Sequence, residues 1–383
     1  MDIVIESIEH SAELLTVRWG DGARSRFHAL WLRDHCQMPE SRNAANGQRY
    51  LDVAALPEVV AIAAASLRGD GAVELLFQPE GHRSVYPADW LRESCFELNA
   101  PHDDRSAAGK TLWDAASIAA QLPRYAWDDY RQRPATQCAA LQSLQDLGFC
   151  LLGGVPPRER MLLEVIGSFG FVRETNYGEL FEVRSQVDAN NLAFTNLGLG
   201  AHCDNPYRDP VPSIQVLHCL SNTVDGGESV LLDGFRAAAL LGEESPGHFD
   251  TLAGTRVNFR FCDRSPQSGA DLRSRVAMIE CNERGEVIKV RYNNRSIDTL
   301  LMPAERVPDF YAAYRHYAQI LQRESLMLVF KLAEGDCLVF DNTRVMHARR
   351  AFSSGGSRHL QGAYSDLDGA YSRLRVLRRE LAK

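Results

Sequence analysis

Two stretches near the N-terminus share one pattern of alternating apolar and polar residues. In each stretch two such runs flank a glycine-containing turn, and a Trp-Leu-Arg sequence follows, at Trp31 and at Trp90. Alternation with a period of two predicts strands, so each stretch predicts a hairpin followed by a short helix or turn. Two copies are too few for a solenoid, and we therefore predict a small β-rich N-terminal domain over residues 1–98. The runs are 15–19 and 25–28 in the first copy, and 73–77 and 82–86 in the second.

The pattern changes after residues 99–112, a polar stretch that we expect to be a linker. Apolar residues three and four apart predict helices, whereas short apolar or alternating runs predict strands, and residues 174–258 are predicted to be mostly short strands with turns. Helices first and many short strands afterwards predict a mainly β barrel or double-sheet jelly roll with flanking helices, over residues 113–383. The predicted helices are 113–122, 136–146, 159–169 and 308–323, and the predicted strands include 149–152, 214–220, 229–232, 325–331, 337–341 and 360–364.

Composition narrows the class of protein. The 383 residues are 45% hydrophobic and 24% charged, and 50 acidic against 42 basic residues give a net charge of -8. This balance disfavours nucleic acid or an anionic membrane as the main partner. The N-terminus lacks the basic and apolar regions of a signal peptide, and nine cysteines form no evident disulfide framework. We therefore expect a cytoplasmic protein with reduced thiols.

The spacing His-x-Asp occurs three times, and its context differs. Two copies, His102/Asp104 and His248/Asp250, lie in the expected linker and at a helix end, where solvated side chains are the simpler interpretation. His202 and Asp204 lie in extended sequence, where residues two apart share a face and can bind one divalent ion. His347, in later strand-like sequence, supplies a third ligand, although a lone core histidine is the plainer interpretation. Two histidines and one carboxylate leave positions open, as in non-haem Fe(II) oxygenases.

Arg358 follows His347 by eleven residues, in a run that predicts the next strand. From that strand its guanidinium could bind a carboxylate with two parallel hydrogen bonds in the same cavity. A metal triad with open positions beside such an arginine matches the requirements of a 2-oxoglutarate cosubstrate.

At this point the sequence resembles the γ-butyrobetaine hydroxylase branch of the Fe(II)/2-oxoglutarate oxygenases, the superfamily of taurine dioxygenase and trimethyllysine dioxygenase. The resemblance covers nearly the whole chain, and it implies a double-stranded β-helix (jelly-roll) catalytic domain, a small N-terminal domain and a homodimer. The segments that carry it are Trp31-Leu-Arg-Asp34, Asp188-Ala-Asn-Asn191, His202-Cys-Asp204, residues 226–235, Phe340-Asp-Asn342, His347-Ala-Arg-Arg350 and residues 357–364.

The resemblance also implies roles for single residues. His202, Asp204 and His347 match the iron ligands, Arg358 matches the partner of the distal 2-oxoglutarate carboxylate, and Ser229 matches the hydroxyl beside it. Family substrates carry a trimethylammonium group, which aromatic faces hold best. The aromatic cage positions are Tyr177, Phe181, Phe194 and Tyr364, and the polar positions for the anionic end of the substrate are Asn191, Asn293 and Asn294.

Arg295 is a cation where we do not expect one in a γ-butyrobetaine hydroxylase. A second positive charge suits a dianionic head group, so we lean to 2-(trimethylammonio)ethylphosphonate as substrate, with γ-butyrobetaine, which gives carnitine, as the alternative. A surface arginine is the plainer interpretation of this residue.

The N-terminal domain departs from the family at its zinc site. Cys36 and His82 match two zinc ligands, but Met38 and Ser41 replace the other two cysteines. Two ligands do not complete a tetrahedral site, so we expect no structural zinc.

Two other classes of protein remain open. A non-catalytic jelly roll that binds quaternary amines would keep the metal site only as a remnant. A hydrolytic metalloenzyme on a cupin-like barrel would leave Arg358 and the aromatic residues without a role.

Overall fold

The computed structural model describes residues 4–99, 103–184, 198–263, 269–352 and 355–382. By its internal contacts the chain divides into two compact units, residues 1–103 and 104–383, and each is described here by itself. Among the described residues, every helix is too short or too polar to cross a lipid bilayer.

The N-terminal unit contains the predicted repeat, as two antiparallel three-stranded sheets that are each followed by a short helix. The hairpins are confirmed, but the first strand of each sheet was not predicted. In β4 only Ile62 is buried, so this strand lacks the apolar alternation that marks β5, where Val73, Leu75 and Phe77 are fully buried. The elements are β1 (Ile5–His10), β2 (Leu14–Trp19), β3 (Arg24–His28), α1 (Ala29–Asp34), a 3-10 turn (Val53–Ala55), β4 (Ala61–Leu67), β5 (Val73–Gln78), β6 (His82–Tyr86) and α2 (Ala88–Glu93).

The second unit is built on two facing sheets, which confirms the mainly β jelly roll with flanking helices. The six-stranded sheet has the order β7-β8-β18-β11-β20-β9, and the four-stranded sheet has the order β10-β19-β12-β17. Their strands are β7 (Arg124–Ala126), β8 (Phe149–Gly153), β9 (Phe181–Arg184), β10 (Leu199–His202), β11 (Ile214–Asn222), β12 (Ser229–Asp233), β17 (Leu328–Phe330), β18 (Cys337–Asp341), β19 (Val345–Arg349) and β20 (Arg358–Ser365).

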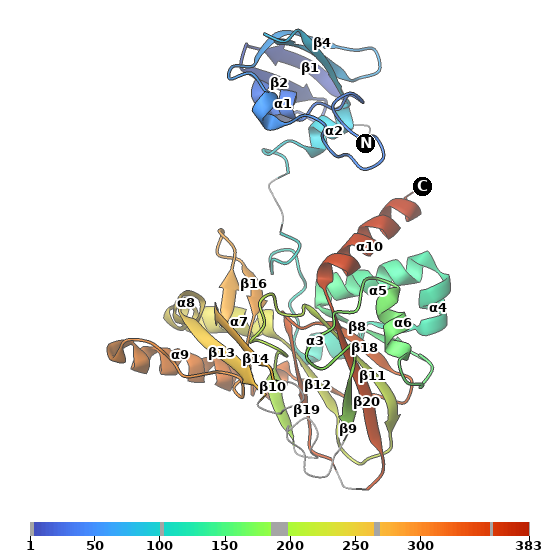
Figure 1. The fold of residues 1–383 in the computed structure, drawn as a ribbon, viewed down its shortest axis with the longest axis vertical. Helices are drawn as coiled ribbons and strands as arrows, with labels where there is room; N and C mark the ends of the chain where they lie inside the picture. The colour runs from blue at the N-terminus through green and yellow to red at the C-terminus, as the bar shows by residue number, and fades with distance from the viewer. Residues whose placement is uncertain (1–3, 100–102, 185–197, 264–268, 353–354, 383) are drawn as a thin grey trace. The chain divides into compact units, whose positions relative to one another are not determined.

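Helices cover the outer face of the six-stranded sheet, where α5, α6 and α10 pack against its strands (Figure 1). This packing explains the unbroken apolar run of β8. Phe149 and Leu151 join the cluster between the two sheets, whereas Cys150 and Leu152 join the cluster under the helices. The helices of this unit are α3 (Ala115–Ala119), α4 (Trp127–Gln132), α5 (Pro134–Leu147), α6 (Met161–Gly167), α7 (Gly234–Glu244), α8 (Pro246–Gly254), α9 (Val307–Ile320) and α10 (Leu367–Leu381), with 3-10 turns at Ala304–Arg306 and Glu324–Leu326.

Two parts of the pattern were interpreted wrongly. The stretch from 174 to 258, predicted to be mostly strands, contains the helices α7 and α8, and α10 was not predicted at all. The buried positions of α7 include Phe235, Ala238 and Leu241, three residues apart, so a helical period was present there. Beside these helices lie two hairpins, β13 (Arg256–Cys262) with β14 (Asp271–Ala277), and β15 (Ile279–Cys281) with β16 (Val287–Val290).

Candidate active site

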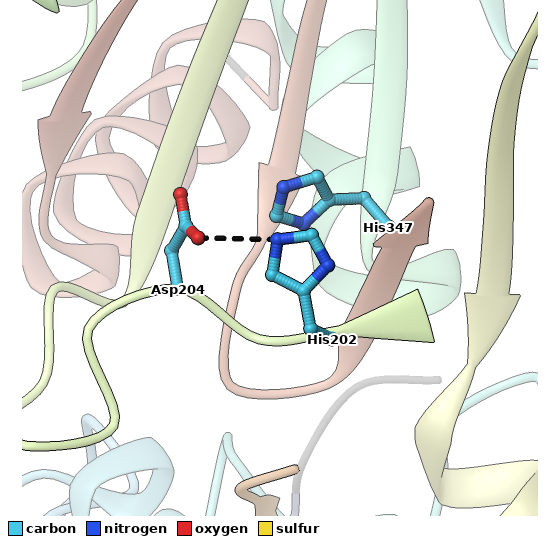
Figure 2. Close-up of side chains that lie close together, drawn as sticks. All are labelled: His202, Asp204 and His347. Carbon is cyan, nitrogen blue, oxygen red and sulfur yellow. Dashed lines mark ion pairs between the residues drawn. The ribbon is translucent and has the colours of Figure 1, made fainter. Parts of the chain in front are cut away.

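The three predicted iron ligands come together. β10 and β19 pair antiparallel in a register that sets His202 opposite His347, and their ring centroids lie 4.2 Å apart. Nε2 of His202 lies 3.4 Å from Oδ1 of Asp204, and the ligand atoms of all three lie within 4.8 Å of one another. Figure 2 shows the two rings and the carboxylate turned toward one point. Asp204 lies on a bend after β10 ends, not on the strand as predicted, so the bend and not strand alternation brings it to the site.

Hydrogen bonds around the triad orient its side chains. Nδ1 of His202 donates to the carbonyl of Gly200 at 2.9 Å, which leaves the Nε2 lone pair for a metal. The hydroxyl of Tyr364 donates to Oδ2 of Asp204 at 2.9 Å. The buried amide of Asn342 holds the Asp204 backbone, since its Oδ1 accepts from the Asp204 N–H at 2.7 Å and its Nδ2 donates to the Asp204 carbonyl at 2.9 Å.

The protonation states suit a divalent ion. Burial, followed by the neighbouring His202, lowers the pKa of His347 to about 3, so its imidazole is neutral. Burial alone would raise the pKa of Asp204, but His202, His347 and Tyr364 outweigh it and hold that pKa well below its usual range. A neutral imidazole such as that of His347 and an ionised carboxylate such as that of Asp204 are the forms that bind metals.

Two observations indicate that iron fits this site: the set of donor atoms, and one buried nitrogen that lacks a hydrogen-bond partner among the described residues. Nδ1 of His347 is buried and has no hydrogen-bond partner among the described residues. Within the described parts of the chain, His202, Asp204 and His347 are also the only group of three such side chains close enough to share an ion. Two imidazoles and one carboxylate are the ligands of non-haem Fe(II) oxygenases.

The residues predicted to bind the cosubstrate line the same cavity, which has a volume of about 540 Å³. Arg358 begins β20 and is 8% exposed, and its Nε has no partner among the described residues. Ser229 begins β12, and Arg349 lies opposite it on β19. Arg349 also lines the cavity, although no role was predicted for it. Burial and the nearby Arg358 lower the pKa of Arg349 to about 10. The alternation of β19 could have revealed it, because residues two apart share a face and His347 lies two residues before.

Aromatic rings form one wall of the cavity. Tyr364 and Phe181 stack with centroids 5.1 Å apart, and Tyr177 follows at 6.2 Å from Phe181. Two further rings were not predicted, Phe261 at 6.0 Å from Tyr177 and Tyr207 at 5.2 Å from Phe261. All five line the cavity, so the wall is longer than the predicted cage. The predicted residues Asn191 and Phe194 lie outside the described residues.

The polar residues at 293–295 divide. Asn293 lines the cavity, but its amide is already engaged, because Nδ2 donates to the carbonyl of Cys203 at 3.1 Å and Oδ1 accepts from the Arg295 N–H at 3.2 Å. Asn294 lines a neighbouring cavity instead, and its Oδ1 accepts from the hydroxyl of Tyr314 at 2.7 Å. Arg295 lines the triad cavity with a solvent-exposed side chain. Of the three, only Arg295 therefore offers the cavity a charge.

The comparisons with known proteins agree with this site. Residues 113–364 match the taurine catabolism dioxygenase TauD, TfdA family, and residues 7–92 match the γ-butyrobetaine hydroxylase-like N-terminal family. The chain is 35% identical to the γ-butyrobetaine dioxygenase of Pseudomonas sp. (strain AK-1), over 95% of this chain and 94% of that one. It is 33% identical to the human γ-butyrobetaine dioxygenase, over 97% and 96%. It is 27% identical to the trimethyllysine dioxygenase of Meyerozyma guilliermondii, over 98% and 96%.

The chain therefore belongs to the TauD, TfdA family of dioxygenases. Within that family it joins a γ-butyrobetaine hydroxylase-like N-terminal unit to the catalytic unit, as the sequence predicted. It is an oxygenase whose cofactor is Fe(II) and whose cosubstrate is 2-oxoglutarate. Membership in this family excludes the hydrolytic and non-catalytic alternatives.

Proposed function

We propose that the enzyme hydroxylates γ-butyrobetaine to carnitine. The observation that carries this proposal is that one cavity contains the metal triad, the buried Arg358 and a wall of aromatic rings. Aromatic faces attract a trimethylammonium group, which has no N–H to donate. The relatives named γ-butyrobetaine dioxygenase favour this substrate over the phosphonate to which the sequence alone had led us.

Different residues of the cavity bind the cosubstrate, the iron and the substrate. Arg358 and Ser229 hold the distal carboxylate of 2-oxoglutarate, and His202, Asp204 and His347 hold the iron, which supplies the oxygen chemistry when bound. The aromatic wall, which includes Tyr177, orients the trimethylammonium group so that a substrate carbon faces the metal. Such positioning is the contribution the protein makes to a cofactor-dependent reaction.

The phosphonate analogue, 2-(trimethylammonio)ethylphosphonate, is a second candidate because of Arg295. Its guanidinium lines the cavity, and Asn293 holds the Arg295 backbone in place. A phosphonate carries more negative charge than a carboxylate, so it would gain more from this cation.

A paired assay tests both candidates. Apo-enzyme is reconstituted without oxygen with Fe(II) and 2-oxoglutarate, oxygen is admitted, and succinate and hydroxylated product are measured for each compound. We expect a higher kcat/KM for γ-butyrobetaine, with one succinate formed per product. A higher value for the phosphonate would favour the second candidate, and succinate without hydroxylated product from either compound would overturn both.

For the N-terminal unit we propose that no structural zinc is bound. Sγ of Cys36 lies 3.3 Å from Nε2 of His82, and the hydroxyl of Ser84 donates to the same sulfur at 2.7 Å. A hydroxyl in contact with both groups supports a hydrogen-bonded trio in place of a zinc site. Metal analysis that finds one zinc per chain beside the iron would contradict this. A homodimer and a cytoplasmic location also stay proposals.

A further inference from the structure

Tyr364 belongs to two parts of the cavity at once. Its ring stacks on Phe181 in the aromatic wall, and its hydroxyl donates to Oδ2 of the metal ligand Asp204 at 2.9 Å. The side chain is 4% exposed, so both contacts are shielded from water. Among the described residues of the wall, this is the one hydroxyl with a hydrogen bond to a metal ligand.

The stack leaves Phe181 little freedom to move independently of Tyr364. Phe181 lies opposite Gly362 in the pairing of β9 with β20, and a Cβ at Gly362 would lie 2.2 Å from the Phe181 ring. The ring thus lies flat on the strand, and Tyr364, two residues along, shares that face. On its other side Phe181 contacts Tyr177. A ligand that orders these rings therefore also orders Tyr364.

The orientation of the Asp204 carboxylate is not fixed by the contacts of its backbone. Asn342 fixes the backbone of Asp204 through two hydrogen bonds, but the orientation of the carboxylate depends on contacts of its own oxygens. Nε2 of His202 lies 3.4 Å from Oδ1, and the hydroxyl of Tyr364 donates to Oδ2 at 2.9 Å. Because Nε2 of His202 keeps its lone pair for the metal, the hydroxyl of Tyr364 is the hydrogen-bond donor that orients this carboxylate.

We propose that Tyr364 is a positioning residue that couples occupation of the aromatic wall to the metal site. A ligand on the wall holds the ring, the ring holds the hydroxyl, and the hydroxyl orients Asp204. The coupling is reciprocal, so a metal that fixes Asp204 also prepares the wall for its ligand. The proposal rests on the trimethylammonium substrate proposed above, and it adds a specific link between the two sites.

Binding measurements test this link without turnover. Isothermal titration calorimetry measures the affinity for γ-butyrobetaine with and without Mn(II) plus 2-oxoglutarate, in the absence of oxygen. Three proteins are compared, the wild type, Tyr364→Phe, and Tyr177→Phe as the matched control. Each variant loses one hydroxyl and keeps its ring, but the Tyr177 hydroxyl contacts Tyr207 and no metal ligand. Direct repulsion between Mn(II) and the ammonium group is common to all three proteins and cancels in the comparison.

We expect Tyr364→Phe to lower the ratio of metal-bound to metal-free affinity by about fivefold, the size of one hydrogen bond. Tyr177→Phe should keep that ratio within about twofold of the wild type. Phe181→Leu keeps the hydroxyl but removes the stack, so it should lower the ratio as well, which covers the case in which Tyr364→Phe does not fold. Under turnover, Tyr364→Phe should also form more succinate per hydroxylated product.

Each result decides a different claim. If the wild type binds γ-butyrobetaine and Tyr364→Phe keeps the wild-type ratio, the coupling role is wrong and the proposed function stands. If the wild type binds neither γ-butyrobetaine nor its phosphonate analogue, with or without Mn(II), the proposed function fails and the coupling role fails with it.

Discussion

The two ends of the cavity are built from different kinds of structure. At the metal end His202, His347 and Ser229 lie on paired strands of one sheet, and Arg358 lies on β20 of the facing sheet. Asp204 lies on the bend that follows β10. At the wall end Phe181 and Tyr364 also lie on strands, but Tyr177 and Arg295 lie outside strands, and Phe261 lies near the end of the β13–β14 hairpin. The metal end therefore depends mainly on the two sheets, whereas the wall end depends in part on connecting segments, which tolerate sequence change. The variants below test whether substitutions at the metal end change the binding of metal and cosubstrate, and whether substitutions at the wall end change the binding of the substrate.

Removing Arg358 should have the largest effect. Its side chain is buried, and in the proposed function it binds the distal carboxylate of 2-oxoglutarate, so Arg358→Ala would remove two charge-assisted hydrogen bonds. We expect KM for 2-oxoglutarate to rise at least ~100-fold, with a much smaller change in KM for γ-butyrobetaine. Arg350→Ala is the control, because that half-exposed arginine pairs with Glu324. Equal rises in both KM values would mean that Arg358 supports the whole cavity instead of one ligand.

Substitution of Asn342 tests whether its hydrogen bonds to the Asp204 backbone contribute to metal binding. Besides its bonds to Asp204, its Nδ2 donates to the carbonyl of Pro212 at 3.0 Å, and the residue is fully buried. Groups that orient a metal ligand typically contribute 10- to 100-fold to metal affinity, so Asn342→Ala should weaken Mn(II) binding by about that range. This loss of Mn(II) affinity should be larger than the loss that follows from the lower thermal stability of the variant. A variant with reduced Tm but unchanged Mn(II) affinity would show that Asn342 serves folding alone.

The same contrast explains what the sequence could reveal. His202 could be predicted from its His-x-Asp spacing to Asp204 in extended sequence, and His347 from its place in later strand-like sequence. Arg358 could be predicted because it lies on the strand that follows His347. The bonds of Asn342 to Asp204 join residues 138 positions apart, and no local pattern encodes such a contact. Phe261 was missed for the same reason, since its place in the wall depends on how a hairpin packs.

Asn293 shows a different limit of sequence interpretation. Its residue type suited an anion-binding amide, and the structure places it on the cavity, but both ends of the amide are occupied by backbone groups. A residue type predicts what a side chain could bind and not what already binds it.

Arg295 lies at the wall end and tests how the anionic head group of the substrate is bound. We expect a smaller effect on kcat/KM here than at the metal end. Arg295→Ala removes a solvent-exposed cation, so screening limits its contribution. We expect kcat/KM for the phosphonate to fall about tenfold and that for γ-butyrobetaine about threefold, while KM for 2-oxoglutarate stays unchanged. The paired assay of both substrates measures the difference. Equal losses for both compounds would remove the reason to consider the phosphonate.

Phe261 should give the smallest effect and the most specific one. The ring lies between Tyr177 and Tyr207 on the cavity wall, so Phe261→Leu keeps apolar bulk and removes one aromatic face. A single cation–π contact corresponds to roughly a three- to tenfold change, so the affinity for γ-butyrobetaine should fall by that amount. The neutral analogue in which a tert-butyl group replaces trimethylammonium is the discriminating probe, because it fills the same space without charge. Phe261→Leu should leave its binding within about twofold, and Phe171→Leu, at a side chain that is 88% exposed, should change neither ligand. An equal loss for the charged and neutral ligands would mean that Phe261 contributes shape alone, and the attraction for the cation would then come from the other rings of the wall.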